Sequence, residues 1–297
     1  MQQQHKRGSL FGSWWLTIDK YMLTAFIITI VFSIIMVITA SPAVAERIGL
    51  NSLYFIQRQL IFLFIGIFIM LGISFCSFET IKKFSLVGFI VFLILLIAVL
   101  FVGTEIKGAK RWISLVFIAI QPSEFIKPFF AIVTSIILMQ KYINPKFPAF
   151  AISFSLYITI VGLLALQPDL GMAITITAIW GGQMFLAGIS MLWIFFLTIG
   201  GILALIAAYT FLPHVTVRMN SFLDPSTSDN YQVKKSIEAF INGGITGTGP
   251  GEGIVKQNLP DSHTDFIFAV VGEEFGMIVA LLVIFLFAFI VIRGLWR

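Results

Sequence analysis

The segment PHVTVRMNSFLDPSTSDNYQVKKSIEAFINGGITGTGPGEGIVKQNLPDSHTD, residues 213–265, interrupts a chain that is otherwise strongly apolar. It holds ten of the 33 Asp, Glu, Lys and Arg residues, four of the ten prolines and six of the 24 glycines. The chain as a whole is 59% hydrophobic and only 11% charged. A polar connection of this length is uncommon between packed elements unless it carries a function. We therefore expect a functional loop set into a membrane protein.

Eight apolar runs of about 20 residues surround this loop, each long enough to cross a hydrocarbon core of roughly 30 Å. A mean hydropathy of +1.01 excludes an ordinary soluble domain. Because backbone groups cannot stay unpaired in lipid, each run predicts a helix. The runs are residues 21–40, 56–75, 84–102, 121–139, 150–166, 170–186, 191–212 and 266–292. We expect an all-α polytopic transmembrane helix bundle, a single membrane domain over residues 1–297, with residues 213–265 as its one long extracytoplasmic loop.

Basic residues in the short connections indicate the orientation of the bundle. They fall on one side if the N-terminus is cytoplasmic, and the long loop then faces outward. The residues concerned are Lys6 and Arg7, Lys82 and Lys83, Lys141 and Lys146, and Arg293 and Arg297. Because these cations are scattered and not interleaved with stacking aromatics, the net charge of +5 does not predict nucleic-acid binding.

Two outward-facing connections carry polar residues at the starts of helices. Lys110 and Arg111 precede Gln121, and their charge violates the inside-positive pattern. They suggest an anion-binding patch, although a solvated basic loop fits the same residues. The sequence Gln-Pro-Ser-Glu then opens a helix, and Lys127 lies on the same face as Glu124. This pair either lines a cavity or forms a structural ion pair.

A second Gln-Pro pair opens the helix at 170–186, where Asp169 is either a helix cap or a cavity-lining acid. The last helix follows His263, Thr264 and Asp265, and Thr264 or Asp265 could cap it. No spacing of the His residues predicts a zinc site. The glycine-rich run at 243–253 suggests either backbone amides gathered around an anion or a turn-rich loop.

Glu273 and Glu274 follow about two turns inside the last helix, at a depth where charges are costly unless paired or hydrated. We expect at least one of them to line a cavity, with the other paired to a cation.

Five short motifs, each beside a predicted membrane helix, together resemble the SEDS family of shape, elongation, division and sporulation proteins. The motifs are GAKRWI (108–113), QPSEFIK (121–127), QPDLG (167–171), NGGITGTGPGEG (242–253) and LPDSHTDFIF with GEEFG (259–268 and 272–276). The resemblance covers nearly the whole chain and is strongest to the cell-division branch. The family fold has ten membrane helices, so the chain is expected to lack the last two.

The resemblance implies a peptidoglycan glycosyltransferase that polymerises lipid II, a disaccharide-pentapeptide on undecaprenyl pyrophosphate, during cell division. It also implies that the catalytic acid lies just before a Tyr-Gln pair, here Tyr231 and Gln232. That position is Asp229, with Asp224 as the alternative. The implied partners are a class B penicillin-binding transpeptidase and other division proteins. The implied location is the bacterial cytoplasmic membrane, at the division septum.

The residues agree with this chemistry. A sugar hydroxyl needs a base such as Asp229, and a lipid pyrophosphate leaving group needs positive charge. The available cations are Lys110, Arg111, Lys127 and Arg218. A divalent cation such as Mg²⁺ could bridge carboxylates to the phosphates, although no metal ligand can be assigned. An inverting single displacement needs one base and no covalent intermediate, by analogy with inverting glycosidases.

The remaining polar residues of this face are predicted to line the cavity around the reacting groups. They are Gln121, Ser123, Glu124, Gln167, Asp169, Tyr231, Gln232, His263, Thr264, Asp265, Glu273 and Glu274. Two rival functions fit the same composition, a transporter that flips lipid II and a non-catalytic scaffold for division proteins. A carrier places its site near the membrane midplane, whereas the polar residues here gather on the outer face.

Overall fold

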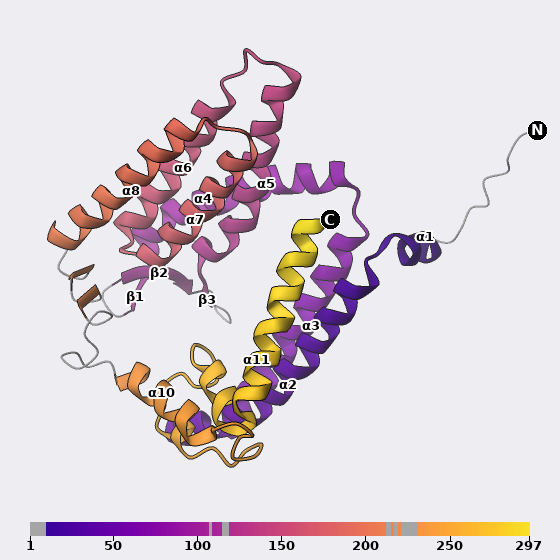
Figure 1. Ribbon diagram of the computed structural model, residues 1–297, viewed down its shortest axis with the longest axis vertical. Coiled ribbons are helices and arrows are strands. Elements are labelled where there is room, and N and C mark those ends of the chain that lie inside the picture. Colours follow the sequence, from indigo (N-terminus) through magenta and orange to yellow (C-terminus); the bar gives the residue numbers. More distant parts are fainter. Residues whose placement is uncertain (1–9, 107–108, 115–118, 212–214, 217–218, 221–230) are drawn as a thin grey trace, which may run out of the picture. The chain divides into compact units, whose positions relative to one another are not determined.

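The computed structural model describes residues 10–106, 109–114, 119–211, 215–216, 219–220 and 231–297 (Figure 1). It divides into two compact units, one made of Met1–Phe75 with Tyr209–Arg297 and the other of Cys76–Ala208. We refer to them as the first and second units.

All eight predicted segments are helices. They are α2 (Lys20–Arg47), α3 (Tyr54–Ser74), α4 (Phe78–Val102), α5 (Pro122–Ile143), α6 (Ala149–Leu166), α7 (Leu170–Leu186), α8 (Met191–Phe211) and α11 (Ile267–Trp296). Six of them are long and apolar enough to cross a membrane, whereas α7 and the Met191–Leu203 part of α8 are apolar but shorter. The prediction of a polytopic helical membrane protein is therefore confirmed.

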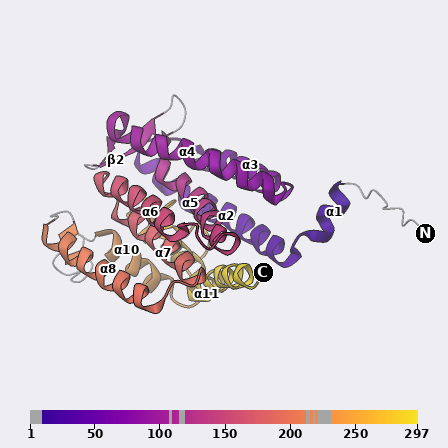
Figure 2. The same ribbon diagram turned by 90° about the horizontal axis from the view of Figure 1, so that it is seen from above.

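The second unit packs α4, α5, α6 and α7 around one apolar core, and α6 and α7 lie side by side in both views (Figures 1 and 2). Leu96, Ile126, Phe130, Ile160 and Leu164 are fully buried at its centre. Every fully buried side chain of this kind contributes about 1.5–3 kcal/mol when it leaves water. In a bilayer this gain is smaller, and close packing between helices carries more of the stability.

A three-stranded antiparallel sheet lies in the α4–α5 connection and was not predicted. Its strands are β1 (Thr104–Ile106), β2 (Ala109–Ser114) and β3 (Ala119–Ile120), in the order β1-β2-β3. β2 pairs with both neighbours and carries Lys110 and Arg111. The basic patch is therefore built on paired strands and not on an open loop.

The first unit contains α2, α3 and α11, together with α1 (Leu10–Thr17), α10 (Tyr231–Gly243) and the short 3-10 helix η1 (Val255–Gln257). α10 is a helix within the long loop of residues 213–265 and begins at its Tyr-Gln pair. Asp19, which caps α2, accepts hydrogen bonds from Tyr21 and Met22. Its carboxylate also contacts Arg293 at 2.9 Å and Arg297 at 3.1 Å, so the start of α2 is tied to the end of α11.

α11 is broken at Gly276, which has φ 76° and ψ 179°. The glycine-rich run takes over the backbone bonds that this break would leave open. Four bonds cross between the two segments, namely Thr248 N to Glu273 O (3.0 Å), Gly249 N to Glu274 O (3.0 Å), Met277 N to Gly244 O (3.0 Å) and Ile278 N to Ile245 O (3.4 Å). The run is therefore neither a free turn-rich loop nor an open anion site. It completes the helix.

We expect Gly247→Ala to destabilise the first unit more than Gly251→Ala. Both glycines have φ +86°, so alanine at either position costs about 1 kcal/mol of backbone strain. A Cβ at Gly247 would also overlap the Glu274 carbonyl, whereas nothing lies within 4 Å at Gly251. Overpacking of this kind costs about 1–3 kcal/mol more. Thermal unfolding of the detergent-solubilised variants measures the difference, and equal melting temperatures would contradict the insertion of the run into α11.

Candidate functional site

Arg111 fastens the sheet to the turn between α6 and α7. Its guanidinium donates through Nε to the Gln167 carbonyl at 3.4 Å and through Nη2 to the Pro168 carbonyl. Nε also lies 3.7 Å from the Asp169 carboxylate. The two connections that were predicted to meet are therefore joined, and two of the five N–H donors of Arg111 bind carbonyls within the protein.

Asp169 is the N-cap of α7, which confirms the capping interpretation. It is 6% exposed and accepts from the Met172 amide at 3.4 Å and from Gln121 Nε2 at 3.4 Å. Gln121 also donates to Ser123 Oγ at 3.0 Å. A lining role in a substrate cavity stays a prediction for these residues.

Gln167 is buried and donates through Nε2 to the Leu96 carbonyl at 2.9 Å. Its Oε1 is buried as well and has no hydrogen-bond partner within the described part of the chain. The side chain therefore fixes the α6–α7 turn to α4 and leaves one acceptor for a ligand or a water molecule.

The cations at the edge of this cluster differ in accessibility. Lys110 is exposed, and Lys127 donates to Glu124 Oε2 at 2.6 Å. Of the two alternatives for this pair, the ion pair is therefore present. Glu124 is about half exposed, and such pairs contribute about 0–1 kcal/mol. Exchanging Glu124 for a phosphate would therefore cost Lys127 little.

Glu273 is one of two fully enclosed acids among the described residues of the first unit. Its side chain is fully buried and accepts three N–H groups: Val255 N at 2.7 Å, Lys256 N at 2.9 Å and Asn242 Nδ2 at 3.0 Å. Enclosure by these donors corrects the expectation that Glu273 lines an aqueous cavity. The anion that the loop amides surround is a carboxylate of the protein itself.

Glu274 is the acid that pairs with a cation, as expected. Its carboxylate contacts Lys256 Nζ, which also donates to the Thr39 carbonyl at 2.9 Å and to the Gly251 carbonyl at 3.0 Å. Both side chains are almost wholly buried. A buried pair is costly to desolvate, but removing only one partner costs far more. Lys256 therefore joins α2, the loop and α11.

A pocket surrounds His263, between α2, α3 and the segment that leads into α11. Its volume is about 270 Å³, and its lining residues are Val37, Ser41, Phe55, Arg58, Gln59, Phe62, His263 and Thr264. The His263 ring packs on Phe55 with centroids 4.2 Å apart. Ser41 Oγ and His263 Nδ1 are buried without a partner among the described residues, which marks a place for a hydrogen-bonding ligand or water.

Burial lowers the pKa of His263 below its ordinary value, and the charge of Arg47 lowers it further. Asp261 and Asp265 oppose the shift. The neutral imidazole is therefore the form that the folded pocket favours.

Thr264 and Asp265 do not cap α11, because Phe266 occupies that position without a side-chain hydrogen bond.

Sequence reasoning missed Asn242, Lys256 and Arg58. Asn242 and Lys256 bind residues that are distant in sequence, and no local sequence pattern predicts such contacts. Arg58 could have been found, because a charge inside the first turn of a predicted membrane helix is a functional signal. Its guanidinium lies 5.8 Å from the Phe62 ring centroid at the edge of the His263 pocket.

α10 begins with the Tyr-Gln pair. Tyr231 is exposed, Gln232 is half-buried, and Lys235 Nζ lies 6.0 Å from the Tyr231 ring centroid. Asp229, Asp224 and Arg218 lie outside the described residues. The last turn of α10 is held by Asn242, so the bonds around Glu273 fix one end of the helix that follows the predicted catalytic acid.

The described residues contain no group of three or more His, Cys, Asp or Glu side chains that could hold a metal ion.

Residues 19–297 match the model of the cell cycle protein family of FtsW, RodA and SpoVE. The protein of Caulobacter vibrioides named probable peptidoglycan glycosyltransferase FtsW is 35% identical over 287 residues, which are 96% of this chain and 74% of that protein. The protein of the same name from Wigglesworthia glossinidia brevipalpis is 33% identical and covers 93% of this chain and 74% of its own length.

Two solved structures share the fold. One, from a study of a peptidoglycan synthase complex, aligns with a TM-score of 0.75 at 23% identity and covers 94% of this chain and 77% of that chain. The other is the Thermus thermophilus rod shape determining protein RodA, with a TM-score of 0.60 at 21% identity, covering 94% of this chain and 74% of that chain.

We expect Glu273→Gln to lower the free energy of unfolding by about 3 kcal/mol, because an amide would leave at least one buried N–H donor unpaired and remove charge-assisted bonds. The matched control is Glu238→Gln on the exposed side of α10, where the acid pairs with Lys235. Chemical or thermal unfolding in detergent compares the two variants. A Glu273→Gln protein as stable as the control would refute the proposed anchoring.

We expect the melting temperature to fall as the pH drops below about 6.5, the ordinary value for histidine. Because the folded state lowers the pKa of His263, the unfolded chain binds more protons in this range and gains relative stability. His263→Gln should reduce the difference between the melting temperatures at pH 7.5 and pH 5.5. An unchanged difference would assign the acid sensitivity to other groups.

Proposed function

Because the chain belongs to the cell cycle protein family of FtsW, RodA and SpoVE, we propose that it is a peptidoglycan glycosyltransferase that polymerises lipid II during cell division. The observation that carries this proposal is the match along almost the whole chain to relatives named for that activity. The chain is an integral membrane protein, and six of its described helices are long and apolar enough to cross a membrane. The two Gln-Pro helix starts joined through Arg111 and Asp169 support the proposal.

In the proposed reaction the Asp229 carboxylate takes the proton from the acceptor sugar hydroxyl, and that oxygen attacks the anomeric carbon of the donor. The bond from this carbon to the lipid pyrophosphate breaks, and the pyrophosphate leaves with the electron pair. One base and a single displacement invert the configuration. Asp224 is the alternative base.

Positive charge near the leaving pyrophosphate stabilises the transition state. Lys110, Arg111, Lys127 and Arg218 are the proposed source. Lys110 is exposed and Lys127 is held only by a weak surface pair, so both can turn to a phosphate. A divalent cation such as Mg²⁺, held by carboxylate and phosphate oxygens together, remains a proposal.

The proposed setting is the bacterial cytoplasmic membrane at the division septum, with a cytoplasmic N-terminus. A class B penicillin-binding transpeptidase and other division proteins are the proposed partners. The fold is shared with a chain from a peptidoglycan synthase complex, which supports the proposal that this protein also acts within a complex. We also propose that residues 1–297 act as one membrane domain, with residues 213–265 as its extracytoplasmic catalytic loop.

We expect Asp229→Asn to lower the rate of glycan polymerisation about 100-fold to 10,000-fold, the range that positioned general bases contribute. The assay follows labelled lipid II with the purified chain, the cognate transpeptidase and Mg²⁺. Asp224→Asn tests the alternative base and should keep most of the activity if Asp229 is the base. Polymer formation at the normal rate by the Asp229→Asn protein would refute the proposed base. Transport of lipid II without polymerisation by the unaltered chain would favour a flippase, and neither activity would favour a scaffold.

A further inference from the structure

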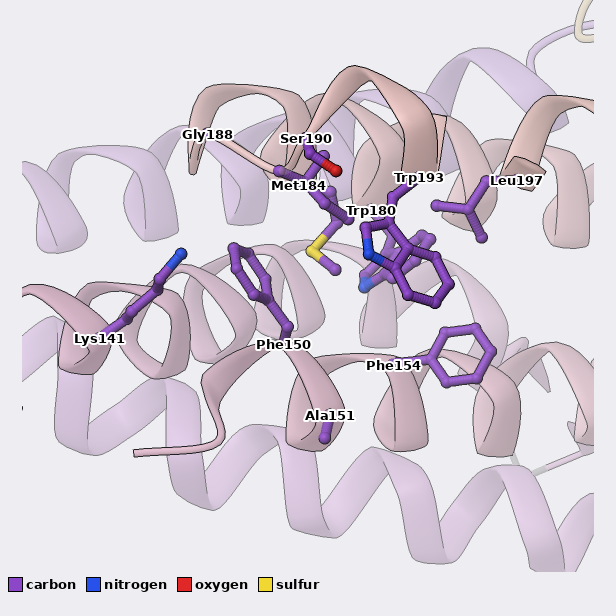
Figure 3. A pocket seen from close by; sticks show the side chains of 11 residues that line it. Lys141, Phe150, Ala151, Phe154, Trp180, Met184, Gly188, Ser190, Trp193 and Leu197 are labelled. Atoms are coloured by element: carbon purple, nitrogen blue, oxygen red, sulfur yellow. The ribbon is translucent and has the colours of Figure 1, made fainter. Parts of the chain in front are cut away.

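An apolar groove runs along α6, α7 and α8 in the second unit. Two cavities of about 660 Å³ and 540 Å³ make it up, and Figure 3 shows the larger one. They share five lining residues and are therefore continuous. The shared residues are Phe154, Trp180, Met184, Ile189 and Leu197.

The floor of the groove is hydrocarbon and aromatic surface whose polar atoms are already paired. Trp180 Nε1 donates to Ser153 Oγ at 2.9 Å, and Tyr157 stacks on the Trp180 ring with centroids 4.4 Å apart. A Cβ added at Gly181, Gly200 or Gly201 would meet nothing within 4 Å. These glycines therefore border open space and not a tightly packed helix. The groove fits a flexible hydrocarbon chain.

One end of the groove is positively charged. Lys141, in the last turn of α5, lines this end, and its Nζ lies 4.0 Å from the Phe150 ring centroid (Figure 3). Tyr142 donates to the Ala187 carbonyl at 3.3 Å and so ties the end of α5 to the end of α7.

No carboxylate balances this charge along the groove. The sequence has no Asp or Glu between Glu124 and Asp169, and none between Asp169 and Asp224. These stretches include all of α6, α7 and α8. At the same end of the unit, Glu79 at the start of α4 pairs with Lys82 at 3.0 Å. Lys141 therefore lacks a carboxylate partner among the described residues and suits an anionic ligand.

The charged end lies where α5 ends, α6 begins, α7 ends and α8 begins. The proposed orientation makes this end cytoplasmic. Trp193 lines the same end and is 61% exposed, as expected for an aromatic residue at a membrane interface. Basic pockets between helices on the cytoplasmic side are suited to anionic lipid headgroups.

We propose that this groove binds an anionic phospholipid of the inner leaflet, with its phosphate at Lys141 and an acyl chain along Trp180. A lipid-linked sugar substrate does not fit as well, because its diphosphate would lie at the opposite, extracytoplasmic end. The inference rests on the proposed orientation and does not require the proposed polymerase activity. Since α8 precedes the loop that contains Asp229, an occupied groove would also support the helix leading into that loop.

The test uses the full-length chain in nanodiscs of phosphatidylcholine with a small fraction of phosphatidylglycerol that carries a photoreactive group in one acyl chain. After illumination, mass spectrometry quantifies the labelled peptides from residues 141–201. We expect labelling of α6, α7 and α8 by this probe, and about a fivefold loss in Lys141→Gln, since one basic residue near a membrane surface contributes a factor of this size. Lys141→Arg should retain the labelling.

Two further variants separate the groove from the general lipid surface. Gly181→Leu should fill the groove and reduce labelling with Lys141 intact, because open space lies beside this glycine. Lys83→Gln removes a cation of another connection and should change nothing. Equal labelling by a phosphatidylcholine probe, or no effect of Lys141→Gln, would overturn the proposal. Displacement of the probe by undecaprenyl phosphate would also overturn it and assign the groove to the substrate. Labelling needs no catalysis, so failure of the polymerase assay leaves this result independent.

Discussion

A helix that is broken inside a membrane bundle must recover its lost backbone hydrogen bonds from another segment, because lipid supplies none. α11 breaks at Gly276, and the glycine-rich run from Gly244 to Gly249 supplies the missing donors and acceptors. Only glycine fits the closest approaches, since a Cβ at Gly247 or Gly276 would overlap the opposing backbone. The composition of the loop therefore follows from its insertion into the helix and not from a need for flexibility.

The side chains of the two acids beside the break, Glu273 and Glu274, bind the loop as well. Glu273 gathers three N–H groups, and Glu274 holds Lys256, which also binds carbonyls of α2 and of the loop. Each buried charge would be costly alone, but the charges occur with their partners. The result is a rigid link from α11 through the loop to the end of α10. If Asp229 is the base, this link limits where the following helix can lie, and a reacting group gains from such fixed placement.

The sequence predicted the membrane helices well because length and apolarity in lipid leave few alternatives. Each predicted span differs from its helix by only a few residues at most ends, and the larger differences include the polar start of α4 and the end of α2. The sheet at β2 was missed, because its basic residues were interpreted as an open patch. The role of Glu273 was also missed, since its donors lie more than 15 residues away along the chain. The catalytic assignment to Asp229 stays a prediction, because that residue lies outside the described part.

Many of the polar residues that the sequence singled out are bound to one another. Arg111 contacts the carbonyls of the α6–α7 turn, and Asp169 caps α7. A guanidinium engaged in this way still contributes positive charge, but it has fewer donors left for a phosphate. The more available cations are Lys110, Lys127 and Arg58, which are exposed or held by weak contacts. The strongly paired residues therefore fix the turns and strands around them. The loosely held cations nearby are the groups best placed to exchange their present contacts for a charged ligand.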